Sequence, residues 1–107
     1  MPTAGALLRG SFQADALISG NDWSLSQDGN INANRIASIP TDGASGLMVW
    51  IWPVDAPDEI TQVPSNLASF MLLAGPDSGD YQAKAAWCNG PDNTLVSDWS
   101  DLKTITV

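Results

Sequence analysis

Apolar and polar residues alternate over several short stretches of this chain, as they do in β-strands that bury one face. In residues 81–87 one face carries Tyr81 and Trp87 at its ends, with two alanines between them. Residues 94–107 resume an alternating, β-branched pattern after a cluster of turn-forming residues at 89–93. The two stretches predict an antiparallel pair of strands near the C-terminus.

A second pair of alternating stretches, residues 21–27 and 30–36, surrounds the dipeptide Asp28-Gly29. Asp-Gly between two such runs is a strong turn signal, because glycine tolerates positive φ and aspartate visits the left-handed region more readily than most residues. The sequence therefore predicts a hairpin over residues 21–36. Its buried face would consist of Trp23, Leu25 and Ile31.

The most apolar run of the chain, residues 47–54, predicts a strand that is apolar on both faces. Leu47, Val49 and Ile51 would face the core, and Met48, Trp50 and Trp52 would point the other way. Burying a large aromatic side chain is worth about 2–3 kcal/mol, so an outward tryptophan pair needs a cover from the N-terminal region or from another chain. The predicted interface comprises Met48, Trp50, Trp52, Leu7 and Leu8.

The remaining stretches predict short strands over residues 36–40, 60–63 and 67–74, with Pro64 breaking the second. Residues 1–20 are glycine-punctuated and predict an arm or an extra strand, and residues 21–107 predict one β-sandwich domain.

The segment Asp77-x-Gly79-x-Tyr81 resembles the tyrosine corner of immunoglobulin-like sandwiches. Residues 81–90, the stretch Ser97-Asp98-Trp99-Ser100 and the closing residues 104–107 are similar to the last two strands of fibronectin type III domains. The resemblance implies an all-β, immunoglobulin/fibronectin type III-like antiparallel β-sandwich.

The chain departs from antibody-type domains at Ala83, where their second cysteine would fall. Cys88 lies five residues too late to replace it, so the resemblance implies no inter-sheet disulfide. Sandwiches of this kind host many unrelated functions, and the resemblance therefore implies a fold alone.

Twelve carboxylates against four cations give a formal net charge of −8. Binding to nucleic acid needs clustered cations and is not expected. The sequence has no run of about 18 apolar residues and no leader in which basic residues precede an apolar stretch. We therefore expect neither a membrane partner nor a signal peptide.

Candidate catalytic residues are few, because histidine is absent and Cys88 has no basic neighbour in sequence. We expect no enzyme activity and no cofactor. Asp22, Asp28 and Asn30 offer hard oxygen ligands around one hairpin, but the calcium-loop spacing is incomplete and a plain turn is the favoured interpretation.

Five tryptophans raise a carbohydrate-binding alternative, in which an indole stacks on a sugar ring and neighbouring carboxylates hold its hydroxyls. Trp99 with Asp98 and Asp101 is the candidate ligand-binding set. Packing of the core explains Trp87 and Trp23 without any ligand.

The segment Trp23-x-Leu-x-x-Asp28-Gly29-Asn-Ile resembles hairpins of bacteriophage fibre and virion proteins. With the two-faced apolar strand and the missing catalytic set, it predicts a virion structural protein, made in the host cytoplasm. The preferred role is capsid decoration, as a cement protein. The expected partners are capsid or tail proteins and further copies of this chain in a homo-oligomer. The alternative is a carbohydrate- or cell-surface-binding module of a fibre or baseplate.

Overall fold

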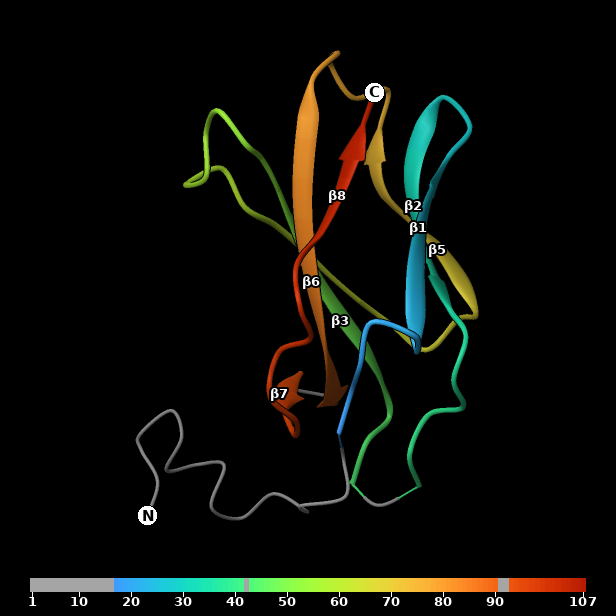
Figure 1. The fold of residues 1–107 in the computed structure, drawn as a ribbon. Coiled ribbons are helices and arrows are strands. Elements are labelled where there is room, and N and C mark those ends of the chain that lie inside the picture. The colour runs from blue at the N-terminus through green and yellow to red at the C-terminus, as the bar shows by residue number, and fades with distance from the viewer. Residues whose placement is uncertain (1–16, 42, 91–92) are drawn as a thin grey trace.

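The structure, a computed structural model, describes residues 17–41, 43–90 and 93–107, and the elements in these residues are β-strands (Figure 1). No helix in this part of the chain is long and apolar enough to cross a membrane. The strands are β1 (Trp23–Gln27), β2 (Asn30–Arg35), β3 (Gly46–Pro53), β4 (Thr61–Ser65), β5 (Ser69–Ala74), β6 (Asp80–Asn89), β7 (Thr94–Leu95) and β8 (Lys103–Thr106).

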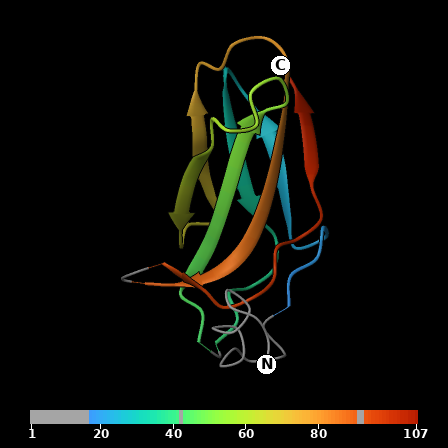
Figure 2. The ribbon, with the colours of Figure 1, turned by 90° about the vertical axis from the view of Figure 1, so that its left-hand side faces the viewer.

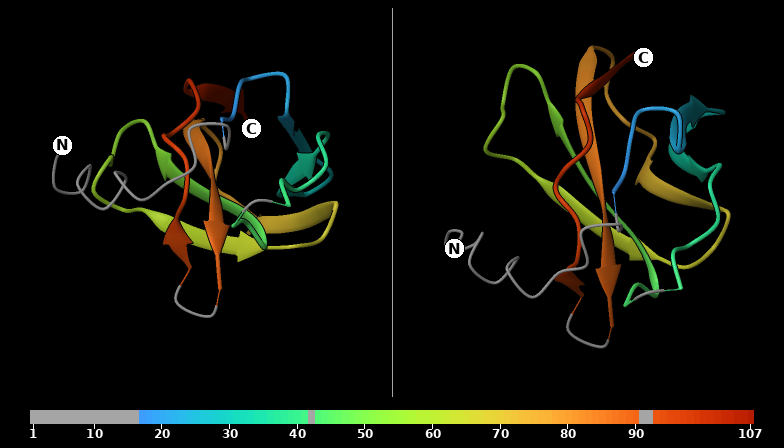
Figure 3. Two further views of the ribbon diagram at one scale, coloured as in Figure 1. Left: turned by 90° about the horizontal axis from the view of Figure 1, so that it is seen from below. Right: turned by 60° about the horizontal axis from the view of Figure 1, so that its bottom comes forward.

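The strands form two antiparallel sheets that pack face to face. The smaller sheet has the order β1-β2-β5, and the larger has the order β4-β3-β6, with β7 and β8 both paired to β6. Figure 2 looks onto the outer side of the larger sheet, and Figure 3 shows the chain passing from one layer to the other between β4 and β5. The all-β antiparallel sandwich predicted from the sequence is confirmed.

The core lies between the sheets and is built from alternate residues, as the period-two pattern predicts. β3 and β6 pair from Gly46 opposite Cys88 to Pro53 opposite Tyr81, and they form the centre of the larger sheet. Small residues on β6 leave room for two fully buried indoles. The buried core consists of Trp23, Ile31, Ala33, Leu47, Val49, Ile51, Phe70, Leu72, Tyr81, Ala83, Ala85, Trp87 and Val96.

The predicted hairpin is present, and Asp28 and Gly29 are the residues between β1 and β2. The last pair of the β1–β2 ladder is Gln27 with Ile31, so Asn30 begins β2 without a partner on β1. Gly29 adopts φ 97°, and the Asp28 carboxylate accepts the N–H of Asn30 at 3.2 Å. Asp28 therefore stabilises the turn through its side chain.

Two smaller predictions were wrong. Residues 36–40 form no strand, because the N–H groups of Ile36 and Ala37 both donate to the carbonyl of Asp22 rather than to a neighbouring strand. Pro64 does not break its strand but lies inside β4, opposite Met48. β4 is an edge strand, where a residue without an N–H is tolerated.

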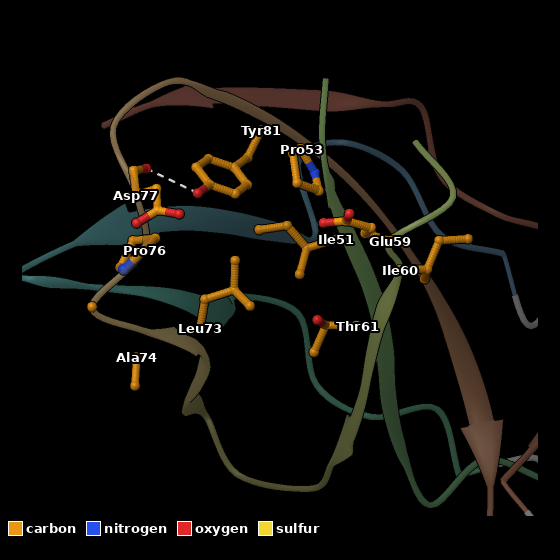
Figure 4. Close-up of a pocket in the computed structure, with 11 residues that line it drawn as sticks. Ile51, Pro53, Glu59, Ile60, Thr61, Leu73, Ala74, Pro76, Asp77 and Tyr81 are labelled. Carbon is orange, nitrogen blue, oxygen red and sulfur yellow. Dashed lines mark hydrogen bonds between the residues drawn. The ribbon is translucent and has the colours of Figure 1, made fainter. Parts of the chain in front are cut away.

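The turn between β5 and β6 has the hydrogen bond expected of a tyrosine corner. The Tyr81 hydroxyl donates to the carbonyl of Asp77 at 2.9 Å (Figure 4). Gly79 adopts φ 143°. Gly79 also exchanges two backbone hydrogen bonds with Val107. The start of β6 is thereby fixed to the end of the chain.

The residues that precede β1 are held against the larger sheet. The indole N–H of Trp87 donates to the carbonyl of Leu17 at 3.0 Å, and the ammonium of Lys103 donates to the carbonyl of Gly20 at 2.8 Å. Residues 17–22 form no strand. The rest of the arm or strand predicted for residues 1–20, with Leu7 and Leu8, lies outside the described residues.

Candidate functional site

The outer face of the larger sheet carries the aromatic side chains that the core does not use. Leu47, Val49 and Ile51 belong to the core, so the alternate residues of β3 point to the opposite side of the sheet. Trp50 pairs with Lys84 of β6, and Trp52 pairs with Gln82. Two tryptophans and a cation thus share one face.

A bulge before β8 brings a third tryptophan to this face. Cys88 pairs with Leu95 and Ala83 pairs with Lys103, so five residue steps on β6 match eight on the C-terminal segment. Three extra residues must leave the ladder between β7 and β8, which is more than the one residue that an ordinary β-bulge inserts. Trp99 lies in this bulged segment, which we define as residues 96–102.

Two serine hydroxyls hold the bulged segment on β6. The N–H of Trp87 donates to Ser97 Oγ at 2.9 Å, and the N–H of Ala85 donates to Ser100 Oγ at 3.1 Å. Ser100 Oγ also accepts the indole N–H of Trp23 at 3.1 Å. The hydroxyls satisfy strand N–H groups that would otherwise lose their partners at the bulge.

Trp50, Lys84 and Trp99 form one contact cluster, which we call the indole cluster. The ring centroids of Trp50 and Trp99 lie 4.9 Å apart with planes tilted by 55°. The Lys84 ammonium lies 4.5 Å from the Trp99 centroid and 5.2 Å from the Trp50 centroid. Such aromatic pairs and cation–π contacts each stabilise by about 0.5–1.5 kcal/mol.

The indole cluster covers part of the outward face of β3, which the sequence predicts to need a cover. Met48 is only 6 % exposed, whereas Trp50, Trp52 and Trp99 are half-buried. The indole N–H of Trp50 is buried and has no hydrogen-bond acceptor among the described residues. The chain therefore supplies some of the predicted cover itself, and the remaining aromatic surface faces solvent.

Two sets of residues that the sequence predicts as alternative sites lie in contact in the structure. Trp50 was an interface candidate and Trp99 a ligand-binding candidate, yet their rings are in contact. Asp98 and Asp101 are exposed on either side of Trp99 in the bulged segment. Lys84 was missed, although its place in the alternation of β6 puts it on the face opposite the core.

The calcium candidates do not converge. Asp22 precedes β1 and Asp28 follows it, and six residues of extended chain span about 20 Å. The Asp22 carboxylate accepts the N–H of Ser19 at 2.8 Å, and that of Asp28 accepts the side-chain amide of Asn32 at 3.0 Å. Within residues 17–41, 43–90 and 93–107, no three His, Cys, Asp or Glu side chains cluster as a metal site.

Cys88 is a buried, free thiol on the outer face of β6. Burial raises its pKa above the ordinary value, because the thiolate would lose its hydration. A raised pKa keeps the sulfur protonated near neutral pH, which suits a packing residue and not a nucleophile.

The cations of the described chain are engaged with neutral partners, so they leave the surface acidic. Lys84 contacts two indoles, Lys103 donates to the carbonyl of Gly20, and Arg35 donates to the carbonyl of Ala37 at 2.8 Å. The whole chain has a formal net charge of −8.

A separate groove opens between the two sheets, on the side where β4 and β5 are the edge strands (Figure 4). Its volume is about 410 Å³, and its floor includes the buried side chains of Ile51 and Tyr81. Glu59 and Asp77 supply the charged side chains of its lining. The groove and the indole cluster are distinct surfaces.

No known protein-family model matches this chain, and no curated protein matches it. The aromatic face, the groove and the charge of the domain are therefore the features that bear on its function.

Proposed function

We propose that the chain is a non-enzymatic structural component of a bacteriophage virion that acts through protein–protein contacts, as a capsid decoration protein. The observation that carries this proposal is the half-buried aromatic face of Trp50, Trp52 and Trp99 on a strongly acidic domain. Tryptophan is enriched at protein interfaces, where the apolar ring is buried and the N–H finds a partner.

The virion setting is supported by the resemblance of the hairpin sequence, from Trp23 to Ile31, to hairpins of bacteriophage virion proteins. The fibronectin type III-like relationship is supported by the strand orders β1-β2-β5 and β4-β3-β6 and by the Tyr81 hydrogen bond at the β5–β6 corner. A rigid sandwich with one aromatic face suits a protein that sits on an existing shell.

A carbohydrate-binding function is the second candidate, and the exposed parts of the same indoles favour it. Two features of the indole cluster weaken it: the Lys84 ammonium lies over both rings, and the Trp50 N–H is buried where a sugar hydroxyl cannot reach it. A flat protein surface can cover the cluster as it stands, whereas a stacked sugar needs an open ring face.

The test is binding of the purified chain to shells of the major capsid protein that lack it. Wild type is expected to bind with a fixed stoichiometry, and Trp52→Ser is expected to weaken binding at least about tenfold by removing an interface aromatic. Met71→Ser is the matched control, because Met71 is 50 % exposed on the smaller sheet. No saturable binding, or equal weakening by both substitutions, would overturn the proposal.

A glycan array probed with the same proteins distinguishes the carbohydrate-binding function from the shell-binding one. Binding of a glycan by wild type that is lost in Trp52→Ser and kept in Met71→Ser, without binding to shells, would replace the first proposal with the second.

A further inference from the structure

The outer face of the smaller sheet carries a row of neutral polar side chains (β1, β2 and β5 in Figure 1). Alternate residues of β2 belong to the core, so Asn32 and Asn34 point to the opposite side of the sheet. Ser26 of β1 pairs with Asn32, and Ser69 of β5 pairs with Asn34. Amide and hydroxyl groups therefore lie side by side across all three strands.

A hollow of about 400 Å³ opens over this row of side chains. Its centre coincides with a bulge, since Ile31 pairs with Leu73 but the next residue, Asn32, pairs with Met71, and one step along β2 thus matches two along β5. A bulge bends its strand and changes the direction of the side chains beside it. The volume lies within the range of about 300–1,000 Å³ typical of ligand sites, so the hollow has room for a small ligand.

Hydrogen bonds hold the polar side chains of the hollow in place. The Asn34 amide nitrogen donates to Ser26 Oγ at 3.1 Å, and the Ser69 hydroxyl donates to Asn34 Oδ1 at 3.0 Å. The Asn32 amide nitrogen donates to the Asp28 carboxylate at 3.0 Å. Side chains that are already oriented lose less conformational freedom when a ligand binds.

The same network leaves both donors and acceptors for a ligand. Within the described chain, Asn32 Oδ1 and the second oxygen of Asp28 accept no hydrogen bond, and the Ser26 hydroxyl hydrogen has no acceptor. A ligand that satisfies these groups must donate and accept hydrogen bonds within one small area. Neighbouring hydroxyl groups, such as those of a sugar ring, do both.

The charge of the hollow favours a neutral ligand. Asp28 is the one charged residue in its described lining, and the whole chain has a net charge of −8, so an anionic ligand is disfavoured. A single carboxylate does not make a metal site, and no three metal-binding side chains cluster in the described residues. Met71, 50 % exposed, adds an apolar contact beside the polar groups. The lining thus matches a molecule that carries hydroxyls and C–H groups together.

We propose that this hollow binds one neutral hexopyranose ring of a glycan. Asp28, Asn32 and Ser26 bind the hydroxyl groups, and Met71 contacts the C–H groups of the ring. The indole cluster lies on the outer face of the other sheet, so the two sites are separate. The inference adds a second binding surface to the proposed function and does not depend on it.

Titration of the ¹⁵N-labelled chain with sugars, followed by NMR, tests the proposal. The neutral probes are the methyl glycosides of glucose, galactose, mannose and N-acetylglucosamine, and the anionic probe is N-acetylneuraminic acid. At least one neutral probe is expected to shift the side-chain amide signals of Asn32 and Asn34 saturably. The anionic probe is expected to leave these signals unchanged, and the indole N–H signal of Trp52 is expected to stay in place with every probe.

Variants of the hollow locate the site. Asn32→Ala is expected to raise the dissociation constant of the bound neutral probe about tenfold or more, because it removes hydrogen bonds to the ligand. Met71→Ser, at an exposed position, is expected to raise it about threefold or more by removing an apolar contact. Asn21→Ala is the matched control, because Asn21 is exposed in the turn before β1 and does not line the hollow. This control and Trp52→Ser are both expected to bind like wild type.

No saturable shift with any neutral probe, or equal weakening by Asn32→Ala and Asn21→Ala, would overturn the inference. Loss of binding in Trp52→Ser with binding kept in Asn32→Ala would place the sugar at the indole cluster and would also overturn it. Asn32→Ala is expected to bind capsid shells like wild type, whereas Trp52→Ser is not. Failure here and failure of the shell-binding proposal are therefore distinguishable.

Discussion

Trp50 and Trp99 come from a central strand and from the bulged segment, and their rings pack with centroids 4.9 Å apart. This contact exists because three extra residues between β7 and β8 carry Trp99 out of the ladder and over the sheet. The same contact turns two isolated indoles into one aromatic face. The indole cluster therefore stabilises the C-terminal segment and shapes the proposed interface at once.

Trp99→Ala is expected to lower the free energy of unfolding by about 1–3 kcal/mol, because it removes the ring pair and a cation–π contact. Urea unfolding followed by circular dichroism measures the change. Leu102→Ala, in the same segment but 53 % exposed, serves as the control with a loss within about 0.5 kcal/mol. Equal losses would mean that the indole cluster does not hold the segment.

Ser100→Ala is expected to cost about 2–3 kcal/mol, since the buried N–H of Ala85 and the indole N–H of Trp23 both lose their acceptor. Thermal unfolding of this variant beside that of Ser38→Ala, an exposed serine outside the strands, measures the difference. A Ser100 variant as stable as the control would show that the hydroxyl does not support the bulge.

Trp50→Phe and Trp23→Phe compare an indole N–H that has no hydrogen-bond acceptor in the described chain with one that has an acceptor. Trp50→Phe removes a buried N–H without an acceptor in the described chain, so we expect a loss below about 1 kcal/mol. Trp23→Phe removes a core N–H bonded to Ser100 and leaves a void, with an expected loss of about 2–3 kcal/mol. The reverse order in chemical denaturation would contradict this assignment.

Ionisation of the Cys88 thiol is expected to lower the free energy of unfolding at alkaline pH. Burial raises the pKa of its thiol in the folded state, so its contribution is complete below the unfolded pKa of about 8.5 and is lost as pH rises through the folded pKa. Cys88→Ala should flatten this part of the pH profile. In the native protein at pH 8 the thiol should react slowly with a thiol reagent, and rapid labelling without denaturant would contradict the burial.

The alternation of the sequence predicted the strands of the core well, because burial at every second residue is a local signal. Trp23, Ile31 and Trp87 are buried where the pattern places them. The direction of Trp50 also followed from the alternation of β3, although its partner did not.

The bulge and its consequences depend on pairing with β6, which no local pattern of residues 94–107 reveals. The sequence alone therefore presents Trp99 as a separate site and does not indicate Lys84 as its partner. The sequence predicts that Pro64 breaks its strand, because a local pattern does not show that β4 lies at a sheet edge, where proline is tolerated.

The central claim is that the aromatic face of Trp50, Trp52 and Trp99 is covered by another protein in the assembled particle. Hydroxyl-radical footprinting with mass spectrometry, applied to the isolated chain and to intact particles, tests it most directly. We predict that Trp52 is oxidised readily in the isolated chain and protected in the particle, while Met71 on the opposite sheet is oxidised equally in both. Equal oxidation of Trp52 in the two states, or absence of the chain from purified particles, would contradict the account.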